Sequence, residues 1–554
     1  MKLVERFKTA SLTMSLFVYA VVSLVLLGPL LAPGFVLTLD MVFTPRLEMP
    51  EQVTSSYLLH TVLHVLGLVL PADVVQKLLL VVILLLTGIG MHRLVVQLRL
   101  ASGAPVYAAG LLYMVNPFTY ERFMAGQYNV LFGYALLPWF VSAMFRLVAV
   151  PVWRRSLAAA AWALLISIVS VHSVVPAVLV ALVIIAWRIV GGQLSRKLCL
   201  QLAIVAIVWL GASTYWLLPV LTGDGSQAQL IGSFSSQDSQ AFATAGDSVI
   251  GRLINVVRLQ GFWAERYGLF ELPQSRLPLI VWGIVLLAIL LFVSIGLVSL
   301  WLQGRRGLFM LLAAVLVSGL VLGSGIGGSW WGQLPLLSGY REPQKLAMLV
   351  AFAYALLVPL GLRTALDFTE QRKMELTAGA LVPIAVAMPF LLTMPYLWGG
   401  GGQLRAVQYP SSWYMLRDRL ESEPRRVTVL SLPWHLYAHT GFAGRVIANP
   451  APQFFDVSMI ASDDPEFAGV AYSKPTAASR QFDTAIERVK NGGDSKSFTA
   501  ALQTHDVQYV MLTKENDYKD YSFLTHQVGL QLVADYKEIS LYRVTANTNL
   551  TKLD

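Results

Sequence analysis

A series of long apolar runs, recurring from the N-terminus to Trp398, constrains this chain more than any other feature. Crossing a bilayer takes roughly 20 apolar residues, and only a helix satisfies its own backbone hydrogen bonds there. Charged residues make up 13% of the 554 residues, against roughly 25% in soluble proteins. We therefore predict a mainly α, polytopic membrane protein. About eleven transmembrane helices are expected to begin near residues 10, 75, 103, 129, 156, 174, 199, 278, 307, 345 and 376.

Basic residues cluster after every second run, which predicts the orientation of the chain. The clusters are Arg93 and Arg99, then Arg146, Arg154 and Arg155, then Arg188, Arg196 and Lys197, then Arg305 and Arg306, and finally Arg363, Arg372 and Lys373. Such clusters mark cytoplasmic loops. The pattern predicts a multi-pass protein of the plasma membrane with a cytoplasmic N-terminus and outer loops at 33–74, 121–128, 222–277 and 327–344. The net charge of +9 reflects this topology, so no nucleic-acid partner is expected.

The pattern changes after residues 1–398, the predicted membrane domain. Residues 399–402 are four glycines, which indicate a flexible joint. Beyond them, residues 404–554 contain short β-like segments at 426–432, 507–513 and 539–544, and helical spacing at 479–491. We predict an extracytoplasmic soluble α/β domain. The only cysteine, Cys199, permits no intramolecular disulfide and is expected to be a small core residue.

Asp40 is the first candidate for chemistry. It lies among Leu, Met, Val and Phe in the segment 37–45, immediately beyond the first apolar run. Partial desolvation raises the basicity of a carboxylate and suits it to take a proton from a hydroxyl. An Asp in a turn or cap near the membrane interface explains the residue equally simply from composition.

The segment 51–70 has helical periodicity and is predicted to lie along the outer leaflet rather than span it. His60 and His64 share one face of this helix and are candidates for substrate binding. The simpler alternative is a pair of solvated histidines on an amphipathic helix.

A polar bridge joins two apolar runs at residues 116–127. Its Glu121 and Gln127 could position sugar hydroxyls, and Arg122 could hold a phosphate. A polar hairpin between two helices remains the structural alternative.

A further polar group precedes the run that begins near residue 345. Arg341 and Lys345 place two cations at the N-terminal end of a helix, where the helix dipole also favours an anion, and this predicts a phosphate site. Tyr340 and Glu342 beside them are candidates for substrate binding. His172, between two shorter runs, is a weaker candidate for phosphate contact.

These motifs carry a resemblance to a known family. The runs Leu39–Phe43, Asn116–Phe118, Gly126–Gln127 and Arg341–Lys345 are similar to those of membrane proteins grouped with the GT-C superfamily of glycosyltransferases, including relatives of arabinofuranosyltransferases and YfhO-like proteins. That superfamily uses sugars linked to polyprenyl phosphate. Many spans, an interfacial helix after the first outer loop and an exported α/β domain also resemble its layout.

The resemblance implies an inverting transfer of a sugar from polyprenyl phosphate to a cell-envelope glycan, lipid or protein. Asp40 would be the general base, and Arg341 and Lys345 would stabilise the departing phosphate. Many members of the superfamily carry paired acids in the first outer loop, but here Met41 follows Asp40 and the next acid is Glu48. We therefore predict no metal and no cofactor, with the lipid-linked sugar as donor substrate, although a divalent metal stays open.

Two other functions remain compatible with the sequence. A transporter or flippase for a lipid-linked or anionic solute should place ionisable residues at mid-membrane and often shows matching halves; the runs are nearly free of charge and show no repeat. A non-catalytic accessory subunit of an envelope polysaccharide machine is the third interpretation.

Overall fold

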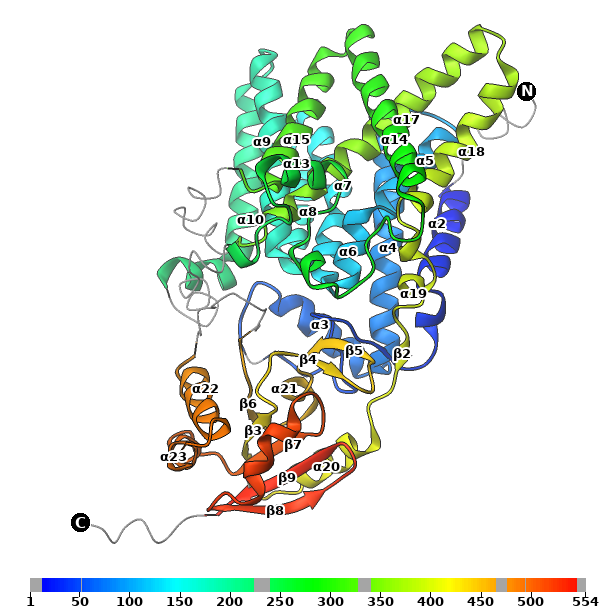
Figure 1. The fold of residues 1–554 in the computed structure, drawn as a ribbon. Coiled ribbons are helices and arrows are strands. Elements are labelled where there is room, and N and C mark those ends of the chain that lie inside the picture. The colour runs from blue at the N-terminus through cyan, green and yellow to red at the C-terminus, as the bar shows by residue number, and fades with distance from the viewer. Residues whose placement is uncertain are drawn as a thin grey trace.

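The computed structural model describes residues 12–50, 52–223, 240–326, 340–464, 476–493 and 495–545. Within these ranges, nine helices are long and apolar enough to cross a membrane, so the chain is a multi-pass membrane protein. They are α2 (Leu12–Leu27, continued by η1, Gly28–Leu31), α4 (Ala72–Gln97), α7 (Tyr128–Ala149), α9 (Val171–Val190), α10 (Arg196–Thr222), α14 (Leu279–Leu302), α15 (Arg306–Gly323), α17 (Ala347–Gln371, preceded by η3, Pro343–Leu346) and α18 (Glu375–Leu392). Figure 1 shows them as one bundle beside a C-terminal sheet.

Two of the eleven predicted spans correspond to shorter helices, so that number is not confirmed. They are α5 (Pro105–Met114) and α8 (Trp153–Val169). Helix α5 stops early because Pro117 disfavours a helical backbone at Asn116, which is extended. The Asn116 side chain then caps α6 (Pro117–Met124) by accepting a hydrogen bond of 3.1 Å from the Thr119 N–H.

Helix α17 is buried continuously from Ala347 to Leu362. A helix that is apolar on all sides requires cover on all sides. Helix α14 packs against it with little space between the backbones, since a Cβ at Gly361 would lie 2.0 Å from the Phe292 carbonyl oxygen, and one at Gly296 would lie 2.4 Å from that of Leu357. This packing fixes the position of α17 and of the residues at its N-terminal end.

Two short amphipathic helices lie outside the spans. Helix α3 (Tyr57–Gly67) confirms the helix predicted within residues 51–70; it buries Leu59 and exposes Val62. Helix α13 (Val249–Val257), which the sequence reasoning did not predict, exposes Ile250. Apolar residues on the open faces of both helices fit a position in the membrane interface.

The C-terminal part contains a five-stranded mixed sheet in the order β6-β3-β7-β9-β8. Strands β6 (Ser458–Ile460), β3 (Thr428–Leu432) and β7 (Tyr509–Thr513) are parallel, and β9 (Ile539–Val544) and β8 (Leu530–Asp535) are antiparallel. Helices α20 (Ser411–Glu421), α21 (Ala451–Phe454), α22 (Ala477–Lys490) and α23 (Lys496–Thr504) complete it, with the hairpin β4 (Tyr437–Thr440) and β5 (Arg445–Ala448). The predicted strands at 426–432, 507–513 and 539–544 and the predicted helix at 479–491 are confirmed.

Backbone pairing joins the C-terminal domain to the loop after the first span. Strand β1 (Phe35–Val36) pairs with β2 (Ala406–Val407) in antiparallel register. In the same loop, shortly after β1, the Leu39 carbonyl accepts a hydrogen bond of 2.9 Å from the Ala448 N–H of β5. Figure 1 shows the β4–β5 hairpin between the sheet and the helical bundle. The loop is therefore part of both halves of the structure.

The glycine run at 399–402 is not a loose joint as predicted. It forms a tight turn (α19, Leu397–Gly401) in which Gly399 and Gly400 are buried and have positive φ. A Cβ at Gly401 would lie 2.5 Å from the Arg276 guanidinium. Glycine is thus used here for close packing.

The expectation for Cys199 is also wrong, because this residue of α10 is exposed. Helix α10 buries few of its side chains in the bundle, among them Leu198 and Gln201. An apolar span with so little protein cover presents most of its surface to lipid, and Cys199 lies on that surface.

Candidate functional site

Asp40 lies at the tip of a two-residue turn. Thr38 and Met41 bridge each other across it, with backbone hydrogen bonds of 3.1 and 2.7 Å, and Leu39 adopts a φ of 32°. The Asp40 N–H donates to the carbonyl of Ala125, in the connection between α6 and α7, at 3.1 Å. Backbone hydrogen bonds therefore fix the position of Asp40 independently of its side-chain contacts.

Gly126 allows this turn to approach the α6–α7 connection. Its φ is +73°, and a Cβ at this position would lie 2.3 Å from both the Met41 nitrogen and the Thr38 carbonyl oxygen. Glycine adopts this left-handed conformation without strain. Gly126 therefore allows the Asp40 turn to pack closely against this connection. The next residue, Gln127, contacts Asp40 with its side chain.

The Asp40 carboxylate is bound on both oxygens. Oδ1 accepts a hydrogen bond of 2.5 Å from the Tyr437 hydroxyl of β4, and Oδ2 accepts one of 3.3 Å from Gln127 Nε2. Burial raises the pKa of the Asp40 carboxyl, the Tyr437 bond lowers it, and the charge of Glu342 raises it again. Many protein atoms lie around this carboxylate, yet the surface of the residue as a whole is exposed.

Glu342 joins two cations of the site, Lys345 and Arg122. Its Oε1 forms an ion pair of 2.9 Å with Lys345 Nζ, and its Oε2 forms one of 2.9 Å with Arg122 Nη1. Burial alone would raise the pKa of Glu342, but the charges of Lys345 and Arg122 outweigh it and lower the pKa to about 2. Glu342 is thus an anion at neutral pH and holds both cations in place.

Arg122 is among the largest fully buried side chains of the described residues. Its Nη1 also donates to Gln127 Oε1 at 2.7 Å, and its guanidinium lies 4.4 Å from the centre of the Phe262 ring. Buried charges require such pairing. This placement indicates that Arg122 positions Glu342 and Gln127 and is not itself exposed to bind a phosphate.

Arg341, Tyr340 and His172 lie around the same cluster. The Arg341 guanidinium lies 4.5 Å from the centre of the Phe242 ring and interacts electrostatically with both Tyr437 and His172. The His172 ring, on α9, packs edge-on against the Tyr340 ring at 5.8 Å. The Tyr340 hydroxyl is buried and has no hydrogen-bond partner among the residues described.

Glu121 lies within the influence of the Arg122 charge, whereas the two histidines of α3 are not brought into this cluster. Burial and the neighbouring Glu265 raise the pKa of Glu121 well above its ordinary value, so Glu121 lies against another acid instead of a recess. His64 Nδ1 hydrogen-bonds to the Leu47 carbonyl at 2.5 Å. Across the described ranges, neither His60 nor His64 forms a hydrogen bond or ion pair with Asp40 or its partners.

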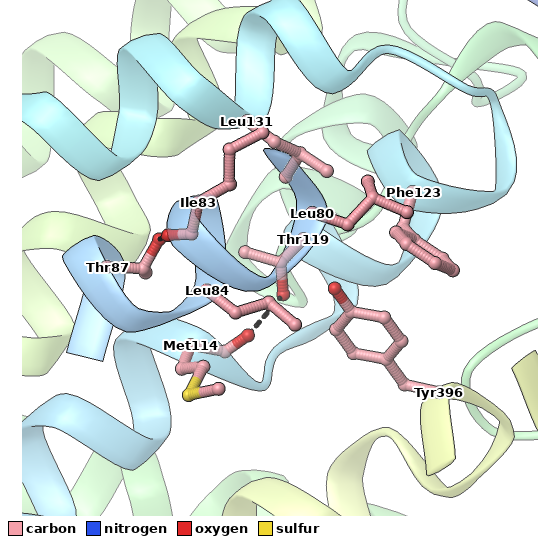
Figure 2. Close-up of a pocket in the computed structure, with 9 residues that line it drawn as sticks. All are labelled: Leu80, Ile83, Leu84, Thr87, Met114, Thr119, Phe123, Leu131 and Tyr396. Atoms are coloured by element: carbon pink, nitrogen blue, oxygen red, sulfur yellow. Dashed lines mark hydrogen bonds between the residues drawn. The ribbon is translucent and has the colours of Figure 1, made fainter. Parts of the chain in front are cut away.

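A small cavity lies behind the site, between α4, α5, α6 and α7. Its lining residues are Leu80, Ile83, Leu84, Thr87, Met114, Thr119, Phe123, Leu131 and Tyr396, and its volume is about 10 Å³. Figure 2 shows the Tyr396 side chain reaching toward it. A space of this size holds about one water molecule. It is therefore no substrate site.

The sequence did not indicate Tyr437 or Phe262 as members of the site. Tyr437 lies 397 residues after Asp40, and Phe262 belongs to the connection that precedes α14. No local spacing relates either residue to the motifs. Within the described residues, no three His, Cys, Asp or Glu side chains form a group that could hold a metal ion.

Comparison with known proteins gives a structural relative without close sequence similarity. No protein-family model matches the chain, and no curated protein matches its sequence. The arabinofuranosyltransferase AftD from Mycobacteria is similar in structure, with a TM-score of 0.65 and 15% identity over 98% of this chain and 40% of AftD. A mutant form of AftD gives 0.61 and 17% over 98% and 42%. The Archaeoglobus fulgidus oligosaccharyltransferase is less similar, with 0.46 and 13% over 90% and 68%.

The chain therefore has a fold similar to that of AftD. At this level of identity the similarity concerns the fold. The chain spans about two fifths of the length of AftD.

Proposed function

We propose that this protein is a membrane glycosyltransferase that moves a sugar, with inversion, from polyprenyl phosphate to a cell-envelope glycan, lipid or protein on the extracytoplasmic side. The observation that carries the proposal is the convergence of Asp40 with the Lys345–Glu342–Arg122 cluster at one end of the bundle. The GT-C-like fold supports the same activity.

In this mechanism Asp40 takes the proton of an acceptor hydroxyl. The acceptor oxygen attacks the anomeric carbon of the donor sugar, and the bond between that carbon and the phosphate oxygen breaks, leaving its electron pair on the phosphate. The protein atoms around Asp40 raise the pKa of its carboxyl, which favours proton acceptance. As the pH is lowered, the transfer rate should therefore begin to fall at a higher pH than it would with an aspartate of ordinary pKa.

The charges of the cluster match those of this reaction. Arg122, Arg341 and Lys345 are cations, and Asp40 and Glu342 are anions, which leaves one positive charge for a donor phosphodiester. When the sugar leaves, the phosphate becomes a monoester with nearly two negative charges at neutral pH, and Asp40 has gained a proton. The sum of charges in the site stays close to zero, so negative charge develops where cations already lie.

Other candidate residues have supporting roles in the proposal. Arg341 and Lys345 contact the phosphate, and His172 lies beside Arg341 as a further donor. The buried Tyr340 hydroxyl, which has no hydrogen-bond partner among the described residues, is suited to hydrogen-bond a substrate oxygen. Gln127 and Glu342 orient Asp40 and the cations.

Substituting Asp40→Asn tests the proposal. The amide keeps the shape of the side chain but accepts no proton, so turnover should fall by about 10²- to 10⁴-fold. The measurement is transfer from a panel of radiolabelled polyprenyl-phosphate sugars in isolated membranes. Asp367→Asn is the matched control, because Asp367 is an exposed residue of α17, ion-paired with Arg363.

Each outcome bears on a different function. A folded Asp40→Asn protein with normal turnover would overturn Asp40 as the base. Unchanged cell-surface glycans in cells that carry this variant would favour an accessory subunit. Movement of lipid-linked sugar across the membrane without transfer would favour a flippase.

A further inference from the structure

Tyr437 connects the C-terminal domain to the proposed general base. Its hydroxyl donates to Asp40 Oδ1 at 2.5 Å, across 397 residues of sequence. Electrostatic interactions also relate Tyr437 to Glu342 and Arg341. A residue of the soluble domain is therefore in contact with the carboxylate that the proposed chemistry requires.

Strand register, rather than a chance surface contact, gives Tyr437 this position. Tyr437 pairs with Ala448 across the β4–β5 hairpin. The Ala448 N–H donates to the Leu39 carbonyl at 2.9 Å, and the Leu39 N–H donates to the Val446 carbonyl at 3.3 Å. The residue before Asp40 is thus attached to the strand opposite Tyr437. Because both links are backbone hydrogen bonds, they fix the tyrosine beside the aspartate.

The two oxygens of Asp40 are bound unequally. The bond from Tyr437 to Oδ1 is 2.5 Å long, whereas that from Gln127 to Oδ2 is 3.3 Å. Short O–H···O⁻ bonds are the stronger kind, and an N–H···O bond of 3.3 Å lies beyond the usual range. Oδ2 is consequently the oxygen that is more easily released to a substrate.

We infer that Tyr437 is a positioning residue of the active site: it holds Oδ1 so that Oδ2 accepts the proton of the acceptor hydroxyl, and the docked C-terminal domain is thereby part of the catalytic unit. This inference rests on the proposed function. Tyr437 keeps its own proton throughout, while Asp40 Oδ2 gains the proton that the acceptor loses.

The hydrogen bond also sets the basicity of Asp40. A donor to a carboxylate stabilises the ionised form more than the protonated form, so the bond opposes the effects of burial and of Glu342, which both raise the pKa of Asp40. Among the residues that the structure describes, the other charged or titratable groups that act on Asp40, Tyr437 or Glu342 include Lys345, Arg341, Arg122 and His172. They all remain when only the Tyr437 hydroxyl is removed.

The test is Tyr437→Phe, which deletes the hydroxyl and keeps the ring. Without the hydroxyl the Asp40 carboxylate loses its fixed orientation, so kcat near neutral pH should fall about 10-fold. The acid limb of the pH–rate profile should move to higher pH, and raising the pH should restore part of the rate. The KM for the polyprenyl-phosphate sugar should change little.

Tyr542→Phe is the matched control, since Tyr542 is a buried tyrosine of β9 in the same domain. It should leave the profile unchanged. A Tyr437→Phe protein with wild-type kcat and acid limb would overturn the inference, and so would a loss of rate that is equal at every pH. If Asp40→Asn is inactive in that case, the proposed function stands and only the role of Tyr437 fails; if Asp40→Asn is active, the proposed function fails first.

Discussion

Glu342 determines whether the cations of the site can exist in a buried position. Lys345 and Arg122 are both largely removed from solvent, and each has an ion pair with this one carboxylate. Two buried cations without a counter-charge would repel each other and lose hydration. Glu342 therefore supplies the counter-charge for both cations, which a donor phosphate would share in the proposed mechanism.

Glu342→Gln should destabilise the protein by about 3 kcal/mol, because it leaves buried charge uncompensated. Polyprenyl phosphate should raise the melting temperature of this variant more than that of the wild type, since the added anion replaces the missing one. Thermal unfolding in detergent, with and without the lipid, measures both effects. Glu370→Gln, an exposed position on α17, is the control. An equal response of both proteins to the lipid would contradict this account.

The same residue makes a prediction for stability against pH. The pKa of Glu342 lies near 4.5 when unfolded and is lowered to about 2 in the folded protein. A carboxyl with a depressed pKa contributes stability that is complete above the unfolded value and is lost as the pH falls toward the folded one. The melting temperature of the wild type should therefore fall between about pH 4.5 and 2 by more than that of Glu342→Gln.

Sequence reasoning identified most of the cluster but not its internal pairing. Asp40, Gln127, Arg341 and Lys345 were predicted because polar groups beside apolar runs require a reason. Spacing does not say which acid neutralises which cation, so Arg122 was expected to bind phosphate directly. Tyr437 could not have been found, because its contact depends on the register of a hairpin far along the chain.

At the scale of elements, the site depends on how closely the Asp40 turn approaches the α6–α7 connection. Gly126→Ala would place a methyl group 2.3 Å from the Met41 nitrogen and in an unfavourable φ of +73°. We expect a loss of about 2 kcal/mol or more in stability and a marked fall in turnover. Gly192→Ala separates the two causes, since Gly192 has a φ of +65° but no atom within 4 Å.

Melting temperature and turnover should be measured for both glycine variants. Gly192→Ala has only the cost of a positive φ and no steric clash, so this variant should keep its activity. Equal effects of the two substitutions would show that close approach at Gly126 has no special importance.

Element boundaries were predictable where a local signal exists. Pro117 and Asn116 lie in the predicted polar bridge at 116–127, yet a full span was still expected to begin near residue 103, because hydropathy outweighed the break. The glycines at 399–402 were taken as a flexible joint because composition does not reveal packing partners such as Arg276. Helix α13 lies within the predicted outer loop 222–277 and was missed although its nine residues have amphipathic helical spacing.

At the scale of the whole molecule, the mechanism requires Asp40, Lys345 and the C-terminal domain in one compartment. We predict that this compartment is extracytoplasmic. In a Cys199→Ala background, Thr484→Cys in α22 should react with an impermeant maleimide in intact cells. Gln193→Cys, between α9 and α10, should react only after permeabilisation. The reverse pattern would overturn the predicted orientation, and with it the extracytoplasmic transfer.

The two-part architecture was predictable from the sequence because helices in lipid are apolar over their whole length, whereas strands of a water-soluble domain are short and mix apolar with polar residues. Long apolar runs indicated the helices, and alternating β-branched residues indicated the strands. How the parts meet was not predictable. The pairings of β1 with β2 and of Leu39 with β5 join segments about four hundred residues apart, and one sequence carries no signal for such pairs.

The attachment of the Asp40 turn to β5 also bears on biogenesis. Leu39 leaves the ribosome early, whereas its partners Val446 and Ala448 are translated much later. In a nascent chain that has inserted every span but has not yet folded β5, the Asp40 turn still lacks these backbone contacts. Under the proposed function, activity should thus arise only after the β4–β5 hairpin has folded against this turn, which would keep partly synthesised chains from acting on lipid-linked sugars.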